Sequence, residues 1–163
     1  MATLHLLHGA VGAGKTTFAK KLERAVRAVR FTPDEWMIRL YGDRPPVETF
    51  QETLDRLYEL IWEHAERVLR TGTDVIMDCG FWSRAARDEA RRRAAALGAS
   101  YRFYAIRCPL EVTRQRTLRR TAELAGRTLW INEPAIDVLN GRVEPLAPDE
   151  DHVAVDGEHL QAS

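Results

Sequence analysis

Short apolar runs alternate with longer amphipathic stretches along the chain. The apolar runs predict strands over residues 4–8, 29–32, 74–78, 101–107 and 152–155. The longer stretches predict helices over residues 15–28, 33–40, 83–97, 109–124 and 133–139, together with a long helix that follows Pro45 and Pro46. Strands that alternate with helices are typical of a parallel sheet covered on both faces. The pattern therefore predicts one α/β layer with five strands.

The long helix carries a single apolar stripe. Its apolar residues recur every three or four positions, which places them on one helix face: Val47, Phe50, Leu54, Leu57, Ile61, Ala65 and Val68. Such a stripe is more typical of core packing than of a ligand groove. Thr71 and Gly72 end the helix in the usual way.

Composition favours one soluble domain over residues 1–163. The chain is 45% hydrophobic and 29% charged, and no apolar stretch approaches the roughly 20 residues that cross a bilayer. Its amino terminus lacks the basic segment of a signal peptide. We expect Cys79 and Cys108 to be free thiols in a reducing compartment, and hence a cytoplasmic protein with no membrane partner. The formal net charge of zero gives little support for a nucleic-acid partner.

A glycine-rich segment follows the first predicted strand and precedes a predicted helix. It matches G-x-x-x-x-G-K-[ST], the phosphate-binding P-loop signature. In this motif glycines let backbone N–H groups turn inward, Lys15 reaches the β- and γ-phosphates, and Thr16 offers its hydroxyl to Mg²⁺. The alternative is a turn that binds nothing, which the flanking strand and helix disfavour. We expect ATP and Mg²⁺ to be held by Gly9, Ala10, Val11, Gly12, Ala13, Gly14, Lys15, Thr16 and Thr17.

Two aspartates follow predicted strands. Asp78 ends the apolar run VIMD, so it lies at the carboxyl edge of the sheet, where ligands of open α/β folds bind. Beside a P-loop it would hold Mg²⁺; the alternative is a residue that caps a turn. Asp34 follows the second strand and would act as the general base toward a substrate hydroxyl. Helix capping by Thr32 or Asp34 is the alternative there.

Arginine dominates the basic residues. Three of the 24 are lysines, which leaves 21 arginines (24 − 3), and most of these are predicted to lie on solvated helix faces, for example Arg91, Arg92 and Arg93. Arg116 and Arg120 are four residues apart and share a helix face. We predict a lid within about residues 114–132, in which this pair stabilises the transferred phosphoryl group. A solvated basic face without a role is the alternative.

The segments PDEW, VIMDCGFWSRAAR and CPLEVTRQRTLRR follow the P-loop in that order. With this arrangement, residues 4–156 resemble the small P-loop kinases, which include zeta-toxin-type sugar kinases, polynucleotide 5′-hydroxyl kinases and chloramphenicol phosphotransferase. The resemblance implies a three-layer P-loop NTPase fold, strand order 2-3-1-4-5 and a helical lid. It also implies that Lys15 and Thr16 are phosphate and Mg²⁺ ligands, Asp34 is the base, and Arg116 and Arg120 are lid arginines. Arg87 matches an arginine that orients the acceptor side in polynucleotide kinases.

Two departures from the polynucleotide kinases concern the acceptor. Met37 stands where those enzymes have an arginine that binds the substrate phosphate, with Arg39 as the nearest replacement. Their D-x-T-N motif is replaced by DCGF. An apolar, aromatic acceptor pocket would instead be formed by Trp36, Met37, Phe81 and Trp82.

These patterns predict an ATP-dependent kinase that phosphorylates a hydroxyl group of a small molecule. The aromatic pocket favours an acceptor with a flat or hydrophobic part. A polynucleotide 5′-hydroxyl kinase is the alternative within the same class, and nucleic acid is the less favoured acceptor. A non-catalytic ATP-binding switch is the alternative from another class.

Overall fold

The computed structural model describes residues 1–160, so the last three residues of the expected domain lie outside the described part. Its parallel strands are β1 (Thr3–His8), β2 (Val29–Phe31), β3 (Val75–Gly80), β4 (Ser100–Arg107) and β5 (Val153–Asp156). Its α-helices are α1 (Lys15–Val26), α2 (Pro33–Tyr41), α3 (Phe50–Arg70), α4 (Arg84–Ala96), α5 (Leu110–Glu123) and α6 (Glu133–Asn140). Every element predicted from the sequence is therefore present, with ends that move by a few residues.

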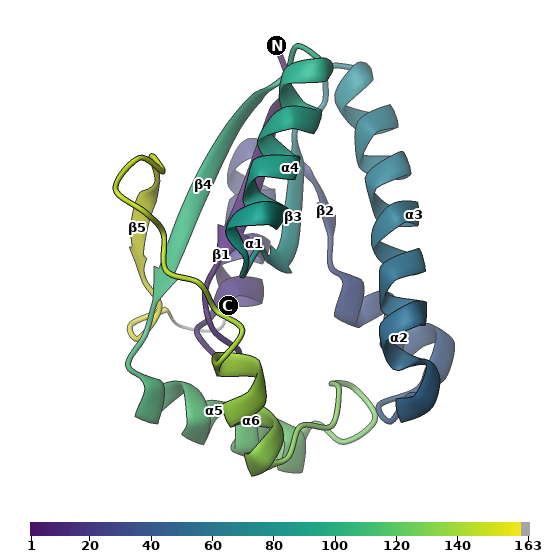
Figure 1. Cartoon of the computed structure of the whole chain (residues 1–163), viewed down its shortest axis with the longest axis vertical. Coiled ribbons are helices and arrows are strands. Elements are labelled where there is room, and N and C mark those ends of the chain that lie inside the picture. Colours follow the sequence, from purple (N-terminus) through teal and green to yellow (C-terminus); the bar gives the residue numbers. More distant parts are fainter. Residues whose placement is uncertain (161–163) are drawn as a thin grey trace.

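The five strands form one sheet in the order β2-β3-β1-β4-β5, which confirms the expected order (Figure 1). All four strand pairs are parallel; Leu4 of β1, for example, is in register with Val75 of β3 and with Tyr101 of β4. Because parallel strands end at the same edge, the segments that follow β1, β2 and β3 meet there. The P-loop, Asp34 and Asp78 all lie in or beside those segments.

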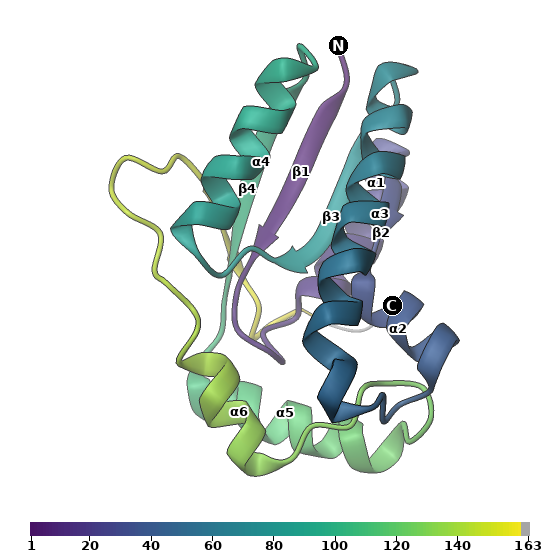
Figure 2. The ribbon, with the colours of Figure 1, turned by 45° about the vertical axis from the view of Figure 1, so that its right-hand side comes forward.

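Helices cover both faces of the sheet, as predicted. Successive β1 side chains point to opposite faces: Leu6 packs in a core with α3 and α4, whereas Leu7 packs in a second core with α1. Both leucines are fully buried. Helices α5 and α6 lie instead beyond the carboxyl ends of the strands (Figure 2). They therefore lie on the side of the P-loop.

The long helix begins later than the sequence pattern predicts. Residues Val47–Thr49 form a 3₁₀ turn, and the Val47 side chain is 85% exposed, so Val47 does not belong to the buried stripe. At the other end Leu69 is buried and Val68 only partly so, because Leu69 lies four residues after Ala65 and continues the buried face. The buried stripe consists of Leu57, Ile61, Trp62, Ala65 and Leu69.

Cys79 and Cys108 are both free and half-buried, as expected. Within residues 1–160 no helix combines the length and the apolar character needed to cross a membrane.

Candidate active site

The P-loop is closely packed and needs its glycines. Gly12 and Gly14 have φ values of 78° and 103°, in the left-handed region that side chains rarely adopt. A Cβ atom on Gly12 would lie 2.5 Å from the Thr113 carbonyl oxygen and 2.5 Å from Thr117 Oγ1. Helix α5 therefore packs directly on the loop, and α1 begins just after Gly14 with its amino end toward an anion site.

Lys15 is held inside this loop. Its ammonium group donates hydrogen bonds to the carbonyl oxygens of Gly9, at 2.9 Å, and Ala10, at 2.7 Å. Burial lowers the pKa of Lys15, whereas the charges of Asp78 and Asp34 oppose that shift. The lysine thus lies in the phosphate-binding loop, within electrostatic reach of two carboxylates.

Asp78 is buried next to the P-loop and bonded to two threonines. Its Oδ2 accepts a hydrogen bond from Thr16 at 2.6 Å and another from Thr32 at 3.3 Å. Burial raises the pKa of Asp78, and the bond from Thr16 and the charge of Lys15 oppose the rise. Because its recorded partners come from other elements, the turn-capping alternative is not supported. The sequence singled out Thr32 only as a helix cap and missed its bond to Asp78.

The residues at this position fit Mg²⁺. Thr16 and Asp78 supply the hard oxygens that Mg²⁺ prefers. Within residues 1–160 no group of three or more His, Cys, Asp and Glu side chains could hold a metal ion. A magnesium ion would therefore be held jointly by these two residues, water and the phosphates of the nucleotide.

Asp34 lies in the first turn of α2, one residue beyond Pro33. Thr32 is the residue before the helix, and it makes no side-chain capping bond. The Asp34 side chain is exposed to solvent, yet protein surrounds it closely enough to raise its pKa, as does the charge of Asp78. Lys15 and Arg120 oppose the rise. Asp34 thus lies within electrostatic reach of both the phosphate lysine and a lid arginine.

The two predicted lid arginines contact different places. Arg120 affects the pKa of Lys15 and of Asp34, and its Nε is buried without a hydrogen-bond partner in the described part of the chain. Arg116 instead donates to the carbonyl oxygen of Gly157 at 2.7 Å and to that of Glu158. The structure therefore places Arg120 beside the phosphate site and Arg116 at the loop after β5.

The segment after α5 reaches across to the connection between α2 and α3 (Figure 2). The backbone N–H of Trp130 donates to the Asp43 carbonyl oxygen at 2.9 Å, and that of Gly126 donates to the Asp43 carboxylate at 3.0 Å. The Arg44 guanidinium lies 4.9 Å from the centre of the Trp130 ring. These contacts join the predicted lid to the side of the site that carries Asp34.

Several residues predicted to bind the acceptor lie elsewhere. Met37 is fully buried and Phe81 is 7% exposed, because both belong to the core under α3. Arg39 is exposed, but it follows Asp34 by five positions and so lies about 140° around the helix from it. This geometry supports none of the three as an acceptor contact. Trp36 and Trp82 are half-buried and remain candidates.

Tyr58 of α3 is a candidate that the sequence did not reveal. Its hydroxyl lies 3.4 Å from the Cys79 carbonyl oxygen, just after Asp78. Burial raises the pKa of Tyr58, and the nearby charges of Cys79, Asp34 and Asp78 raise it further. Tyr58 therefore lies beside the end of β3, near Asp78. Tyr58 directly follows Leu57 of the buried stripe, so the helical repeat could have placed it at the border of the buried face of α3.

Arg87 is buried and hydrogen-bonded to protein groups, so its guanidinium is not available to bind a substrate. Only 1% of its side chain is exposed, and it forms an ion pair with Glu150 at 2.7 Å. Its remaining donors go to the carbonyl oxygens of Phe81, Trp82, Glu144 and Pro145. A direct contact between Arg87 and an acceptor is therefore not supported.

The arginines that follow it on α4 are not all solvated. Arg91 bonds to Glu150 and lies 4.8 Å from the Phe103 ring centre, and Arg93 lies 4.9 Å from the Trp62 ring centre. Only Arg92 has the predicted exposure, at 72%. Successive residues differ by about 100° around a helix, so these three consecutive arginines contact different parts of the protein or solvent.

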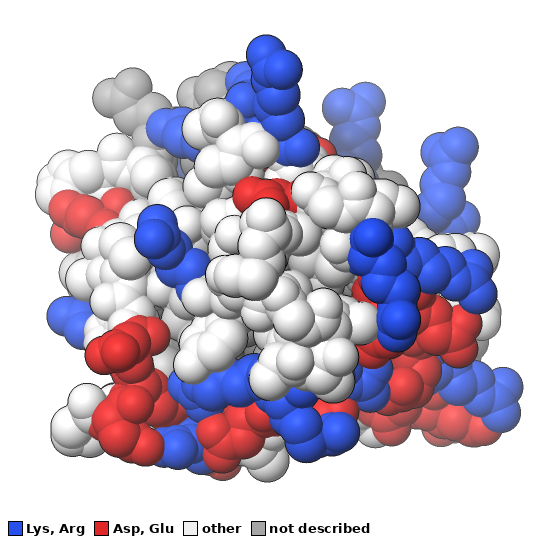
Figure 3. Space-filling model, turned by 90° about the horizontal axis from the view of Figure 1, so that it is seen from above, with Lys and Arg blue, Asp and Glu red and all other residues white. Residues whose placement is uncertain are grey.

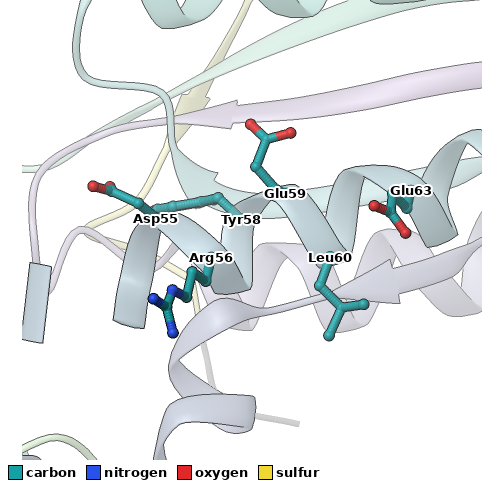
Figure 4. A pocket seen from close by; sticks show the side chains of 6 residues that line it. All are labelled: Asp55, Arg56, Tyr58, Glu59, Leu60 and Glu63. Carbon is teal, nitrogen blue, oxygen red and sulfur yellow. The ribbon is translucent and has the colours of Figure 1, made fainter. Parts of the chain in front are cut away.

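A hollow of about 620 Å³ lies along α3, and its lining residues all belong to that helix, Tyr58 among them. Figure 4 shows that Glu59 points to the opposite side of the helix from Arg56 and Leu60, which also line it. Side chains of one helix that point apart do not converge on a ligand. The geometry around Lys15, and not this hollow, therefore defines the candidate site.

Solved structures with a similar fold include the following three. A Chloroflexus aurantiacus protein proposed to be a kinase is 17% identical, with a TM-score of 0.76, 97% of this chain covered and 89% of that one. A gluconokinase from Sinorhizobium meliloti 1021 is 16% identical, with a TM-score of 0.65 and coverage of 95% and 82%. A chain of the Pnkp1/Rnl/Hen1 RNA repair complex is 24% identical, with a TM-score of 0.70 and coverage of 86% and 43%.

No curated protein matches the sequence. The family described as an AAA domain, however, matches residues 4–146. That match spans most of the chain and includes the whole phosphate-binding loop. The protein therefore belongs to the AAA domain family and is a P-loop nucleotide-binding protein.

Proposed function

We propose that this protein is an ATP-dependent kinase that transfers the γ-phosphoryl group to a hydroxyl of a small molecule. The observation that carries the proposal is the exposed carboxylate of Asp34, which lies within electrostatic reach of Lys15 and Arg120. A P-loop that only binds nucleotide needs no such carboxylate. Phosphoryl transfer to a hydroxyl needs a group that accepts the proton of the acceptor.

Each residue of the site has a role in this reaction. Asp34 would orient the acceptor hydroxyl and take its proton, while Lys15 and Arg120 stabilise the negative charge that spreads over the transferred oxygens. Thr16 and Asp78 would hold the magnesium ion. When bound, Mg²⁺ neutralises phosphate charge.

The surroundings of Asp34 favour a small acceptor. Trp36, Tyr58 and Trp82 are half-buried aromatic side chains on α2, on α3 and in the turn after β3. Asp34 lies on α2 and Asp78 on β3, so these three residues would form an aromatic wall near the two aspartates. The similarity to a gluconokinase supports the same class of acceptor. A hydroxyl compound with a flat or apolar part is the acceptor that this wall suits.

A polynucleotide 5′-hydroxyl kinase is the second candidate, because the fold is also similar to a chain of an RNA repair complex. The overall charge of zero does not favour it. The face at the amino ends of the strands, which lies opposite the P-loop, carries interspersed positive and negative side chains and no basic patch (Figure 3). That face bears only on contacts with nucleic acid remote from the phosphate site. Transfer of labelled γ-phosphate to a 5′-hydroxyl oligonucleotide, read on a gel, would support this candidate. If no label is transferred, a small molecule is the favoured acceptor.

ADP release in the presence and absence of hydroxyl compounds tests the proposal. A kinase should release ADP faster with a suitable acceptor than with water alone. A non-catalytic switch should bind ATP, hydrolyse it slowly and show no acceptor dependence. The phosphorylated product, identified by mass spectrometry, assigns the acceptor.

Replacement of Asp78 by Asn should weaken the response to magnesium. Asn keeps the shape of the side chain but loses the charge beside Thr16, so we expect about tenfold or more Mg²⁺ for half-maximal turnover. Titration of Mg²⁺ at saturating ATP measures this. The control is Asp55→Asn on the exposed side of α3. An unchanged magnesium requirement in Asp78→Asn would contradict the metal role.

The lid arginines should separate in their kinetic effects. Arg120→Ala should lower kcat by about tenfold or more, because Arg120 lies beside Lys15 and Asp34. Arg116→Ala should mainly raise the KM for ATP, because it loosens the loop at Gly157, which packs on the P-loop. Exposed Arg92→Ala is the control. If Arg120→Ala behaves like Arg92→Ala, the basic face has no catalytic role.

A further inference from the structure

Two carbonyl oxygens of the P-loop each accept two hydrogen bonds. The Gly9 oxygen accepts from Lys15 and from the indole Nε1 of Trp82, both at 2.9 Å. The Ala10 oxygen accepts from Lys15 at 2.7 Å and from the backbone N–H of Ala13 at 3.2 Å. If Lys15 leaves either oxygen, that oxygen therefore still accepts one hydrogen bond. For Gly9 the second donor is a side chain from outside the loop.

A tight turn brings Trp82 to that position. Gly80 and Phe81 have φ values of 87° and 42°, so two successive left-handed residues reverse the chain at the end of β3. A Cβ atom on Gly80 would lie 2.7 Å from Trp82 Nε1, which shows how closely the indole folds back. A left-handed conformation is unfavourable for a residue such as Phe81. Its presence calls for contacts that maintain it.

The surroundings of the turn supply those contacts. Arg87 donates to the carbonyl oxygens of both Phe81 and Trp82, at 3.1 and 3.0 Å. His8 Nδ1 lies 3.1 Å from the same Phe81 oxygen, and the Phe81 ring packs edge-on against Phe103. The ion pair between Arg87 and Glu150 is buried on both sides. The position of Trp82 is thus built by the fold.

We propose that Trp82 is a positioning residue that frees Lys15 for the phosphates of a bound nucleotide. Lys15 has three N–H donors, two of which bond to the loop. To contact both the β- and γ-phosphates it must give up at least one of them. The bond to Gly9 is the one released, because it is the longer of the two, at 2.9 against 2.7 Å, and because the second bond to the Gly9 oxygen is the shorter one, at 2.9 Å from Trp82 against 3.2 Å from Ala13 to Ala10. Because Trp82 keeps the Gly9 oxygen bonded, the lysine can turn away without the penalty of an unpaired buried carbonyl. The proposal concerns binding of the nucleotide and does not depend on the acceptor.

A double-mutant cycle with Lys15 tests this. Trp82→Phe keeps an aromatic ring and removes only the donor. It should weaken ATP binding by about tenfold, measured by titration calorimetry. The melting temperature without nucleotide should change little, because Lys15 still bonds to Gly9. In a Lys15→Ala background the same change should have almost no further effect on ATP affinity, because no lysine has to be released.

Tyr101→Phe is the matched control, since it also removes only the donor of an aromatic side chain, and Tyr101 is exposed near the amino end of β4, at the opposite edge of the sheet from the P-loop. It should leave ATP affinity unchanged. An equal loss of ATP affinity from Trp82→Phe with and without Lys15 would overturn the proposal and make Trp82 a shaping residue of the loop. Unchanged ATP affinity in Trp82→Phe alone would overturn it as well.

Discussion

Replacement of Lys15 by Ala should abolish ATP turnover and leave the fold intact. The lysine supplies the positive charge of the phosphate site, so turnover should fall by at least about a hundredfold. Stability should hardly change, because the carbonyl oxygens of Gly9 and Ala10 keep their bonds from Trp82 and Ala13. ADP release and thermal unfolding measure the two effects.

Lys20→Ala is the matched control, because Lys20 is an exposed lysine on the same helix. It should change neither turnover nor melting temperature. Near-normal ATP turnover by a folded Lys15→Ala protein would contradict the assignment of the phosphate site.

Replacement of Asp34 by Asn should abolish transfer to the acceptor and spare ATP binding. A general base contributes about 10²–10⁴-fold, so transfer should fall within that range. ATP affinity should stay nearly the same, because Asp34 makes no hydrogen bond to the P-loop within residues 1–160. The control is Glu48→Gln, an exposed carboxylate in the turn before α3. Equal losses of ATP binding and transfer would contradict the role as base.

The pH dependence of transfer should report the same residue. The protein that closely surrounds the exposed Asp34 carboxylate, and the charge of Asp78, raise the pKa of Asp34 above its usual value. Because a base acts in its deprotonated form, transfer should decline as the pH falls through this raised pKa, at a higher pH than for an ordinary aspartate. In Asp34→Asn the residual rate of transfer should not show this decline at low pH. If the residual rate of the variant still declines at low pH, another titrating group causes that decline.

The fold was predictable because its signals are local. Ser83 bonds to the Ala86 N–H at the start of α4, as an N-cap does, and Gly72 ends α3 in the left-handed conformation. The start of α3 was less predictable. Val47 fits the apolar repeat, but the turn after Pro46 is 3₁₀ and leaves its side chain in solvent.

The site was predictable where a residue's position follows from its own element. Lys15 and Asp78 follow directly from a glycine-rich loop and a strand end. The bond between Trp82 and Gly9 joins residues 73 positions apart, and the pair of Arg87 and Glu150 spans 63 positions. No periodicity signals such contacts. The sequence therefore predicted Arg87 on the acceptor side, whereas in the structure Arg87 is buried and paired with Glu150.

Transfer of a labelled γ-phosphate into a small-molecule extract of cells tests the central claim most directly. ATP labelled at the γ-position would be incubated with the extract and with wild-type, Lys15→Ala or Asp34→Asn protein, and the products separated by chromatography. We predict a new labelled small molecule that forms with the wild-type protein and with neither variant. Label that appears only in inorganic phosphate, at the same rate for wild-type and Asp34→Asn, would contradict a kinase and favour a nucleotide-binding switch.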